Sequence, residues 1–270
     1  MGSRANVLML HGYAQSGIAF EIKTRFLQDP LREAISTALS VNNQLFAPSS
    51  IEFFYPNGIL PAQIPNTHNP IILEAQEDDK NLNQYRQCIL DEHPANDLWT
   101  WAYGDHGSEN IVGFDESIRY VLELLNEHGP FIGIIGFSMG AALAAITASL
   151  LEPDRRVKNS HFKIEHPPLH FAVCYSGFMP SHKQYRHLHY PKIETPILHF
   201  IGNLDPWISG SRTLQLARRC RSTKVAYFFG THFVPRSRDM IKILARFVTE
   251  ACDGNEDESI ESLESDWVDI

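Results

Sequence analysis

A serine flanked by glycines lies near the middle of the chain. Residues 136–140 read Gly-Phe-Ser-Met-Gly, directly after the apolar run Phe131–Ile135 and before the alanine-rich segment 141–146. A strand, a G-x-S-x-G turn and a helix in this order are typical of a nucleophile elbow, in which a tight turn holds the serine above the edge of a sheet. We therefore predict that Ser138 is a catalytic nucleophile and that its flanking glycines avoid clashes with neighbouring elements.

An acid and a base follow the serine in a suitable order. A serine hydroxyl is a weak nucleophile at neutral pH and needs a base, which a third group orients. Asp205 follows the apolar run Ile197–Ile201, and His232 follows Val225–Phe229. Active sites of α/β sheets are built where strands end, and the order Ser, acid, His accompanies the elbow. We predict a triad of Ser138, Asp205 and His232; the alternative for Asp205 is an Asx turn that begins a loop.

Acyl transfer also needs N–H groups that stabilise the oxyanion. One donor is predicted to be the backbone N–H of Met139, the residue after the nucleophile. The second should come from the loop after the first strand, where residues 11–14 read His-Gly-Tyr-Ala. We choose the N–H of Tyr13, with Ala14 as the alternative, and expect His11 to hold the loop rather than to act as a base.

The remaining histidines and the cysteines indicate neither a metal nor a cofactor. We expect five clustered histidines to be surface residues, namely His161, His166, His170, His187 and His189. Two of these are spaced as H-x-H, but no third ligand follows at a suitable spacing. The four cysteines form no C-x-x-C pair. They are interpreted as reduced structural thiols of an intracellular protein.

The elements that must position these residues alternate along the chain. Short apolar runs without polar alternation suit strands that are covered on both faces. Six such runs are predicted: Asn6–Leu10, Ile51–Tyr55, Phe131–Ile135, Phe171–Tyr175, Ile197–Ile201 and Val225–Phe229. Helical spacing of apolar residues appears between them, for example over 114–127 and 240–251. The alternation predicts an α/β fold with a mostly parallel, doubly wound sheet of about six strands flanked by helices.

Composition and charge exclude several classes of protein. The 270 residues are 43% hydrophobic and 20% charged, and the formal net charge is −9. Residues 253–270 carry eight acidic and no basic side chains, which leaves −1 for the rest. The chain therefore lacks the basic face that nucleic acids require, and no stretch approaches the roughly 18 apolar residues of a membrane span. No signal peptide is recognisable, so we expect a cytoplasmic protein.

The charge pattern also divides the chain. We predict one domain over residues 1–252 and a flexible acidic tail over 253–270. Ile260, Leu263 and Trp267 in the tail would suit one side of a short helix that contacts a protein partner. A homodimer is compatible with the sequence, and no exposed apolar stripe identifies an interface.

The ordered set of motifs resembles the FSH family of serine hydrolases, which is common in fungi. The resemblance runs from about Val7 to Val248. Its motifs occupy 10–17 (Leu-His-Gly-Tyr-Ala-Gln-Ser-Gly), 112–118, 136–142, 176–178 (Ser-Gly-Phe), 201–206 and 232–235. It implies an α/β-hydrolase fold without a large lid domain and a triad of Ser138, Asp205 and His232.

The resemblance implies two kinds of acyl substrate. The family includes carboxylesterases and fungal thioesterases that release polyketide acyl chains in secondary metabolism. The sequence does not choose between an ester and a thioester, or between a small-molecule and a carrier-bound acyl group. Two other readings stay open: a ligand-binding protein of the same fold that has lost catalysis, and a catalyst of acyl transfer or condensation.

Aromatic residues near the predicted site are candidates for an acyl-binding pocket. Apolar walls suit an acyl chain, and residues in loops after strands face the cleft in such folds. Trp101, Phe178, Trp207 and Phe233 occupy loop positions of this kind. We predict that these four residues line the substrate pocket.

Overall fold

The computed structural model describes residues 4–42, 50–62, 97–104, 111–159 and 162–253. Six strands, all parallel, form one sheet with the order β2-β1-β5-β6-β7-β8. They are β1 (Arg4–Leu10), β2 (Ser50–Phe54), β5 (Phe131–Phe137), β6 (Phe171–Tyr175), β7 (Ile197–Gly202) and β8 (Thr223–Phe228). A short antiparallel pair joins β3 (Leu60–Pro61) to β4 (Trp99–Thr100). The predicted parallel sheet is confirmed, whereas the short pair was not foreseen.

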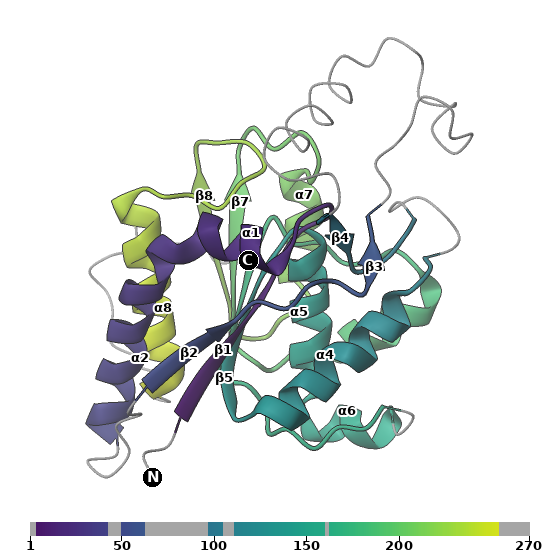
Figure 1. Cartoon of the computed structure of the whole chain (residues 1–270), viewed down its shortest axis with the longest axis horizontal. Helices are drawn as coiled ribbons and strands as arrows, with labels where there is room; N and C mark the ends of the chain where they lie inside the picture. The colour runs from purple at the N-terminus through teal and green to yellow at the C-terminus, as the bar shows by residue number, and fades with distance from the viewer. Residues whose placement is uncertain (1–3, 43–49, 63–96, 105–110, 160–161, 254–270) are drawn as a thin grey trace.

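Helices cover both faces of this sheet (Figure 1). The α-helices are α1 (Gly17–Thr24), α2 (Gln28–Asn42), α4 (Phe114–His128), α5 (Met139–Leu150), α6 (Pro153–Lys158), α7 (Gly210–Ala217) and α8 (Arg238–Asp253). Two 3₁₀ helices are η1 (Arg25–Leu27) and η2 (Lys183–His189). Helices α2 and α8 lie side by side on one face, and α4 and α5 lie on the other. Among the described residues there is no separate lid domain.

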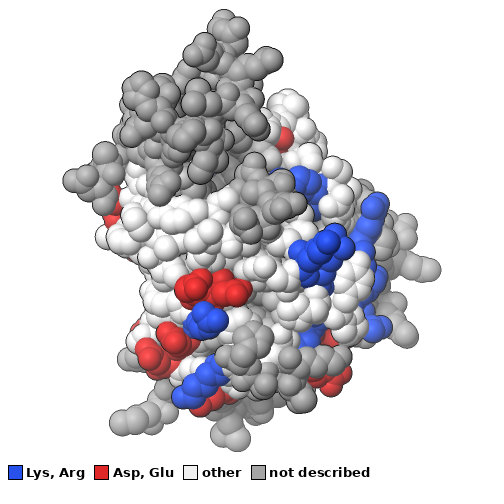
Figure 2. Space-filling view, turned by 90° about the vertical axis from the view of Figure 1, so that its right-hand side faces the viewer, with Lys and Arg blue, Asp and Glu red and all other residues white. Residues whose placement is uncertain are grey.

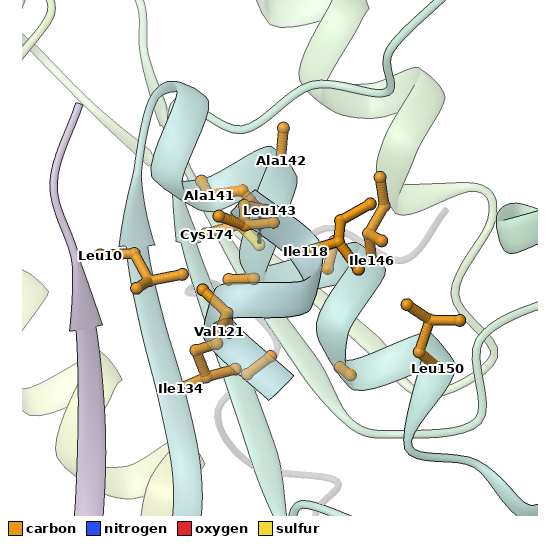
Figure 3. Packing of buried hydrophobic residues seen from close by; sticks show 14 of the residues in the cluster. Leu10, Ile118, Val121, Ile134, Ala141, Ala142, Leu143, Ile146, Leu150 and Cys174 are labelled. Atoms are coloured by element: carbon orange, nitrogen blue, oxygen red, sulfur yellow. Dashed lines mark hydrogen bonds between the residues drawn. The ribbon is translucent and has the colours of Figure 1, made fainter. Parts of the chain in front are cut away.

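The core has two halves, one on each face of the sheet. Because side chains alternate along a strand, Leu8 and Leu10 of β1 enter one apolar cluster while Val7 and Met9 enter the other. Figure 3 shows the first cluster, where β1, β5 and β6 meet the facing sides of α4 and α5. Every residue of α5 is buried, so the alanine-rich sequence lets this helix pack closely on the sheet.

The described part of the chain begins with β1 at Arg4 and ends with α8 at Asp253. Helix α8 ends at Asp253, and the tail proposed for protein contacts lies outside the described residues. The division of the chain at residue 252 stays a prediction.

The face shown in Figure 2 carries both acidic and basic side chains among uncharged ones. No helix within the described ranges is both long and apolar enough to cross a membrane.

Two histidines that were expected at the surface are instead buried. His166 is 4% exposed, and its Nε2 accepts a hydrogen bond from the N–H of Phe131 at 2.8 Å. His189 is wholly buried, and its Nδ1 donates to the carbonyl O of Tyr185 at 3.1 Å. The prediction was wrong because each ring bonds a backbone group inside the fold: the N–H of Phe131 for His166 and the carbonyl O of Tyr185 for His189. His166 anchors the start of β5 in this way.

Buried histidines give the fold a dependence on pH. Burial lowers the pKa of His189 to about 4 and that of His199 to about 3, from an ordinary value of 6.5. Between pH 6.5 and these values the unfolded chain binds more protons than the folded chain, so stability falls as pH falls. Each ring is expected to remove up to about 1.4 kcal/mol of folding stability per pH unit below 6.5.

The melting temperature measured from pH 7 to pH 4 tests this expectation. The Tm should fall through this window, and it should fall less steeply in the His199→Gln variant, whatever the variant's Tm at pH 7. Parallel Tm curves for the two proteins would contradict the assignment of this acid sensitivity to His199.

Candidate active site

The turn between β5 and α5 has the geometry of a nucleophile elbow. Ser138 has φ 54° and ψ −117°, directly between the last residue of β5 and the first residue of α5. A non-glycine residue rarely adopts a positive φ, and such strain clusters at functional sites. The N–H of Ser138 donates to the carbonyl O of Tyr175 at 2.9 Å, which ties the turn to β6. The side chain of Ser138 is partly exposed.

The two flanking glycines are required by close backbone contacts. A Cβ on Gly136 would lie 2.3 Å from the carbonyl O of Gly140. A Cβ on Gly140 would lie 2.3 Å from the carbonyl O of Leu10 and 2.4 Å from that of His11. Real Cβ atoms do not approach backbone oxygen this closely, so each glycine allows the elbow to pack against its neighbours.

Gly140→Ala is therefore expected to disturb the elbow. The new methyl would push on the end of β1 and on the loop that follows it. We expect the variant to lose about 3 kcal/mol of stability and most of its hydrolytic activity, both measurable from denaturant unfolding and from ester turnover. Gly210→Ala is the matched control, because its Cβ would meet only the side chain of Ile201, at 3.3 Å. Wild-type stability in Gly140→Ala would contradict this role of the glycine.

The structure brings Asp205 and His232 together. They lie in the loops that follow β7 and β8, at the upper end of the sheet in Figure 1. The Nδ1–H of His232 donates to Oδ2 of Asp205 at 2.7 Å, and the two side chains are 11% and 1% exposed. With the proton on Nδ1, the Nε2 atom of the neutral ring is an acceptor. The ring of His232 packs against Phe137, the residue before Ser138, with ring centroids 4.6 Å apart.

The carboxylate of Asp205 is held at both oxygens. Oδ1 accepts the backbone N–H groups of Trp207 and Ile208, each at 2.9 Å. Oδ2 accepts the hydroxyl of Ser176 at 2.7 Å in addition to His232. Burial alone would raise the pKa of Asp205, but the hydrogen bond and electrostatic interaction with His232, together with the hydrogen bonds from Ile208 and Ser176, outweigh burial and hold the pKa below its ordinary value. Asp205 therefore stays ionised and forms an Asx turn while it binds the histidine.

Two backbone segments meet beside Ser138. Met139 is the first residue of α5, and the first N–H groups of a helix have no acceptor within the helix. The loop after β1 approaches from the other side, since a Cβ on Gly12 would lie 3.4 Å from Cβ of Ser138. Tyr13 follows in this loop, and Ala14 closes it with φ 53°. The assignment of the Tyr13 and Met139 N–H groups to the oxyanion stays a prediction.

Hydrogen bonds made by the side chains of His11 and Gln15 hold the loop after β1 in place. Nδ1 of His11 donates to the carbonyl O of Gly12 at 2.7 Å, and its Nε2 accepts the N–H of Gly58 at 2.8 Å. Gln15 accepts the N–H of Gly12 through its side-chain oxygen at 3.2 Å. Both nitrogens of the buried His11 ring are thus used in hydrogen bonds to the backbone. This geometry fits the structural role expected for His11.

Trp101 does not line an open pocket, contrary to the prediction. Its side chain is wholly buried, its indole N–H donates to the carbonyl O of His11 at 2.8 Å, and its ring centroid lies 4.9 Å from that of His11. A buried indole needs a hydrogen-bond acceptor, and the loop after β1 supplies one. Trp101 therefore supports this loop from beneath instead of forming an open wall of a cleft.

The other three aromatic residues divide by exposure. Phe178 is 3% exposed and lies under the guanidinium of Arg212, which stands 4.9 Å from the ring centroid. Trp207 and Phe233 are 37% and 44% exposed, and they lie close in sequence to Asp205 and His232 respectively. Trp207 and Phe233 are thus available to a ligand, whereas Phe178 is covered.

Sequence reasoning missed Ser176 as a residue of the site. The Ser-Gly-Phe motif at 176–178 indicated that this position follows a strand, but not that its hydroxyl binds Asp205. No group of three or more His, Cys, Asp or Glu side chains suited to a metal occurs in the part of the chain that the structure describes.

The chain has recognisable relatives among known proteins. Family of serine hydrolases 2 of Saccharomyces cerevisiae is 29% identical over 91% of this chain and 98% of its own length. Esterase OVCA2 of Danio rerio is 28% identical over 85% of this chain and 89% of its own length. Two Schizosaccharomyces pombe proteins, an uncharacterized hydrolase and a dihydrofolate reductase, are 25% and 27% identical over 91% and 87% of this chain. The chain spans about half the length of these two, 51% and 45%.

Solved structures share the fold at low identity. The chain is similar to esterase PE8 with a TM-score of 0.56 and 16% identity, covering 93% of this chain and 94% of that one. It is similar to acyl-protein thioesterase 2 of Zea mays with a TM-score of 0.54 and 15% identity, covering 93% and 95%. These similarities identify the α/β-hydrolase fold.

The family comparison matches nearly the whole chain. Residues 1–243 match the serine hydrolase (FSH1) family. This range includes Ser138, Asp205 and His232 together with the loop after β1. The chain belongs to the FSH1 serine hydrolase family.

Proposed function

We propose that this chain hydrolyses acyl esters or thioesters through Ser138, His232 and Asp205 and an acyl-enzyme intermediate. The observation that carries the proposal is the 2.7 Å hydrogen bond from His232 Nδ1 to an ionised Asp205, at the same edge of the sheet as a strained, partly exposed Ser138. Membership of the serine hydrolase family supports it.

In the proposed reaction His232 acts first as a base and then as an acid. Its Nε2 takes the proton of Ser138 while the hydroxyl oxygen attacks the acyl carbon, and Asp205 stabilises the imidazolium that forms. The N–H groups of Tyr13 and Met139 would receive the negative charge of the tetrahedral oxygen. His232 then returns the proton to the leaving alcohol or thiol. Water, activated by His232, releases the acid and restores the serine.

The substrate is proposed to be an apolar acyl group of medium size. Exposed apolar side chains lie beside the acid and the base, at Leu204, Trp207 and Phe233. Relatives named as esterases and a structural neighbour named as an acyl-protein thioesterase support both leaving groups. Within this proposal we keep release of a polyketide-type chain from a carrier in fungal secondary metabolism, in the cytoplasm, as the finer hypothesis.

Turnover of matched substrates tests the proposal. A p-nitrophenyl ester and an acyl thioester with the same acyl chain should both be hydrolysed by the wild type, and neither by Ser138→Ala. The ratio of kcat/KM for the two substrates ranks ester against thioester. Saturable binding without turnover would favour the ligand-binding reading. Formation of a new ester with an added alcohol, in place of the free acid, would favour acyl transfer.

A further inference from the structure

Ser176 lies between the strands that carry the nucleophile and the acid. Strand β6 separates β5, which leads into Ser138, from β7, which leads into Asp205. Neighbouring strands are about 4.8 Å apart, so the two catalytic loops begin roughly 10 Å from each other. A residue at the end of β6 is therefore placed to set the position of one relative to the other.

The end of β6 is bonded to both neighbouring strands. The carbonyl O of Tyr175 accepts the N–H of Ser138 at 2.9 Å, and the N–H of Ser176 donates to the carbonyl O of Phe200 in β7 at 3.0 Å. The hydroxyl of Ser176 then reaches Oδ2 of Asp205 at 2.7 Å, the same oxygen that accepts Nδ1–H of His232. Ser176 is 1% exposed.

The backbone of Ser176 is in a conformation that favours glycine. Its φ is +48°, in the left-handed region, where a Cβ carries a conformational penalty that glycine avoids. A serine at this angle retains its hydroxyl at the expense of that penalty. The hydroxyl has a defined acceptor, which is the carboxylate of the acid.

We infer that Ser176 is a positioning residue that fixes the carboxylate plane of Asp205 and, through it, the ring of His232. The inference rests on the proposed function of the triad. Oδ1 is already held by two backbone N–H groups, so Ser176 is the donor that prevents Oδ2 from turning away from the histidine. Because Ser176 acts through Asp205, its loss should lower kcat and leave KM nearly unchanged.

A pair of substitutions separates the hydroxyl from the backbone. Ser176→Ala removes the hydroxyl and keeps the unfavourable φ, whereas Ser176→Gly removes the hydroxyl and relieves it. We expect both variants to lose about tenfold in kcat toward a p-nitrophenyl ester, with KM within about twofold of wild type. The Tm of Ser176→Gly should lie above that of Ser176→Ala.

Ser149→Ala is the matched control. Ser149 lies in the last turn of α5, and its buried hydroxyl donates to the carbonyl O of Leu188. Loss of this hydroxyl should lower the Tm and leave kcat unchanged. Wild-type kcat in Ser176→Gly, or a loss confined to Ser176→Ala, would overturn the inference, because the hydroxyl would then not matter. A loss of kcat in Ser149→Ala equal to that in the Ser176 variants would overturn it as general destabilisation. Absence of turnover by the wild type would overturn the proposed function itself.

Discussion

Replacement of His232 by alanine is expected to lower kcat for ester hydrolysis by roughly a millionfold. The Nε2 atom of this ring is the acceptor left over once Nδ1 is bonded to Asp205. Without it, the hydroxyl of Ser138 has no base, and the leaving group receives no proton. Single-turnover and steady-state rates with a p-nitrophenyl ester measure the loss.

Two controls make this result specific. His187→Ala removes an exposed ring whose Nε2 bonds Asn159, and it should leave kcat unchanged. Added imidazole should restore part of the activity of His232→Ala, because a small base can occupy the vacated space. A loss of less than about tenfold in His232→Ala would mean that another group takes the proton of Ser138.

Asp205→Asn is expected to lower kcat by about 10⁴-fold with little change in folding. The amide oxygen can keep the two N–H bonds that Oδ1 now accepts from Trp207 and Ile208, so the loop geometry is retained. The amide NH₂ would then face His232 as a donor and would favour the tautomer that carries its proton on Nε2. That tautomer cannot accept the proton of Ser138.

Asp97→Asn is a matched control for the loss of a carboxylate. Asp97 accepts the indole N–H of Trp99 through Oδ1 at 2.9 Å, and its replacement should leave kcat near the wild-type value. Circular dichroism and Tm confirm folding of both variants. Activity of Asp205→Asn within tenfold of wild type would show that the histidine is oriented by other contacts.

The sheet could be predicted from the sequence because its strands are buried on both faces. Each apolar run predicted a strand within two residues of its observed ends, as in β1, expected at Asn6–Leu10 and found at Arg4–Leu10. The parallel order then brings the loops after β5, β7 and β8 to one edge. This arrangement is the basis for predicting that Ser138, Asp205 and His232 meet at one edge of the sheet, and the structure shows the contact between Asp205 and His232.

The supporting residues could not be predicted because their partners are distant in the chain. Trp101 bonds a carbonyl 90 positions away, and Ser176 bonds Asp205 from 29 positions away. The local spacing of apolar residues along the sequence does not predict contacts between residues so far apart. The same holds for His166, whose acceptor nitrogen meets the start of β5 from 35 positions away. Sequence patterns thus predicted the triad residues, whereas the hydrogen bonds to Asp205 and to the loop after β1 became evident only in the structure.

The proposed function requires that Ser138 is an activated nucleophile. Intact-mass spectrometry after treatment with a fluorophosphonate probe tests this most directly. Wild type and Ser138→Ala are compared after Tm measurements have shown that both proteins are folded. We expect one adduct per chain on the wild type, mapped to Ser138, and none on the variant. A folded wild-type protein without an adduct, or an adduct that persists in Ser138→Ala, would contradict it.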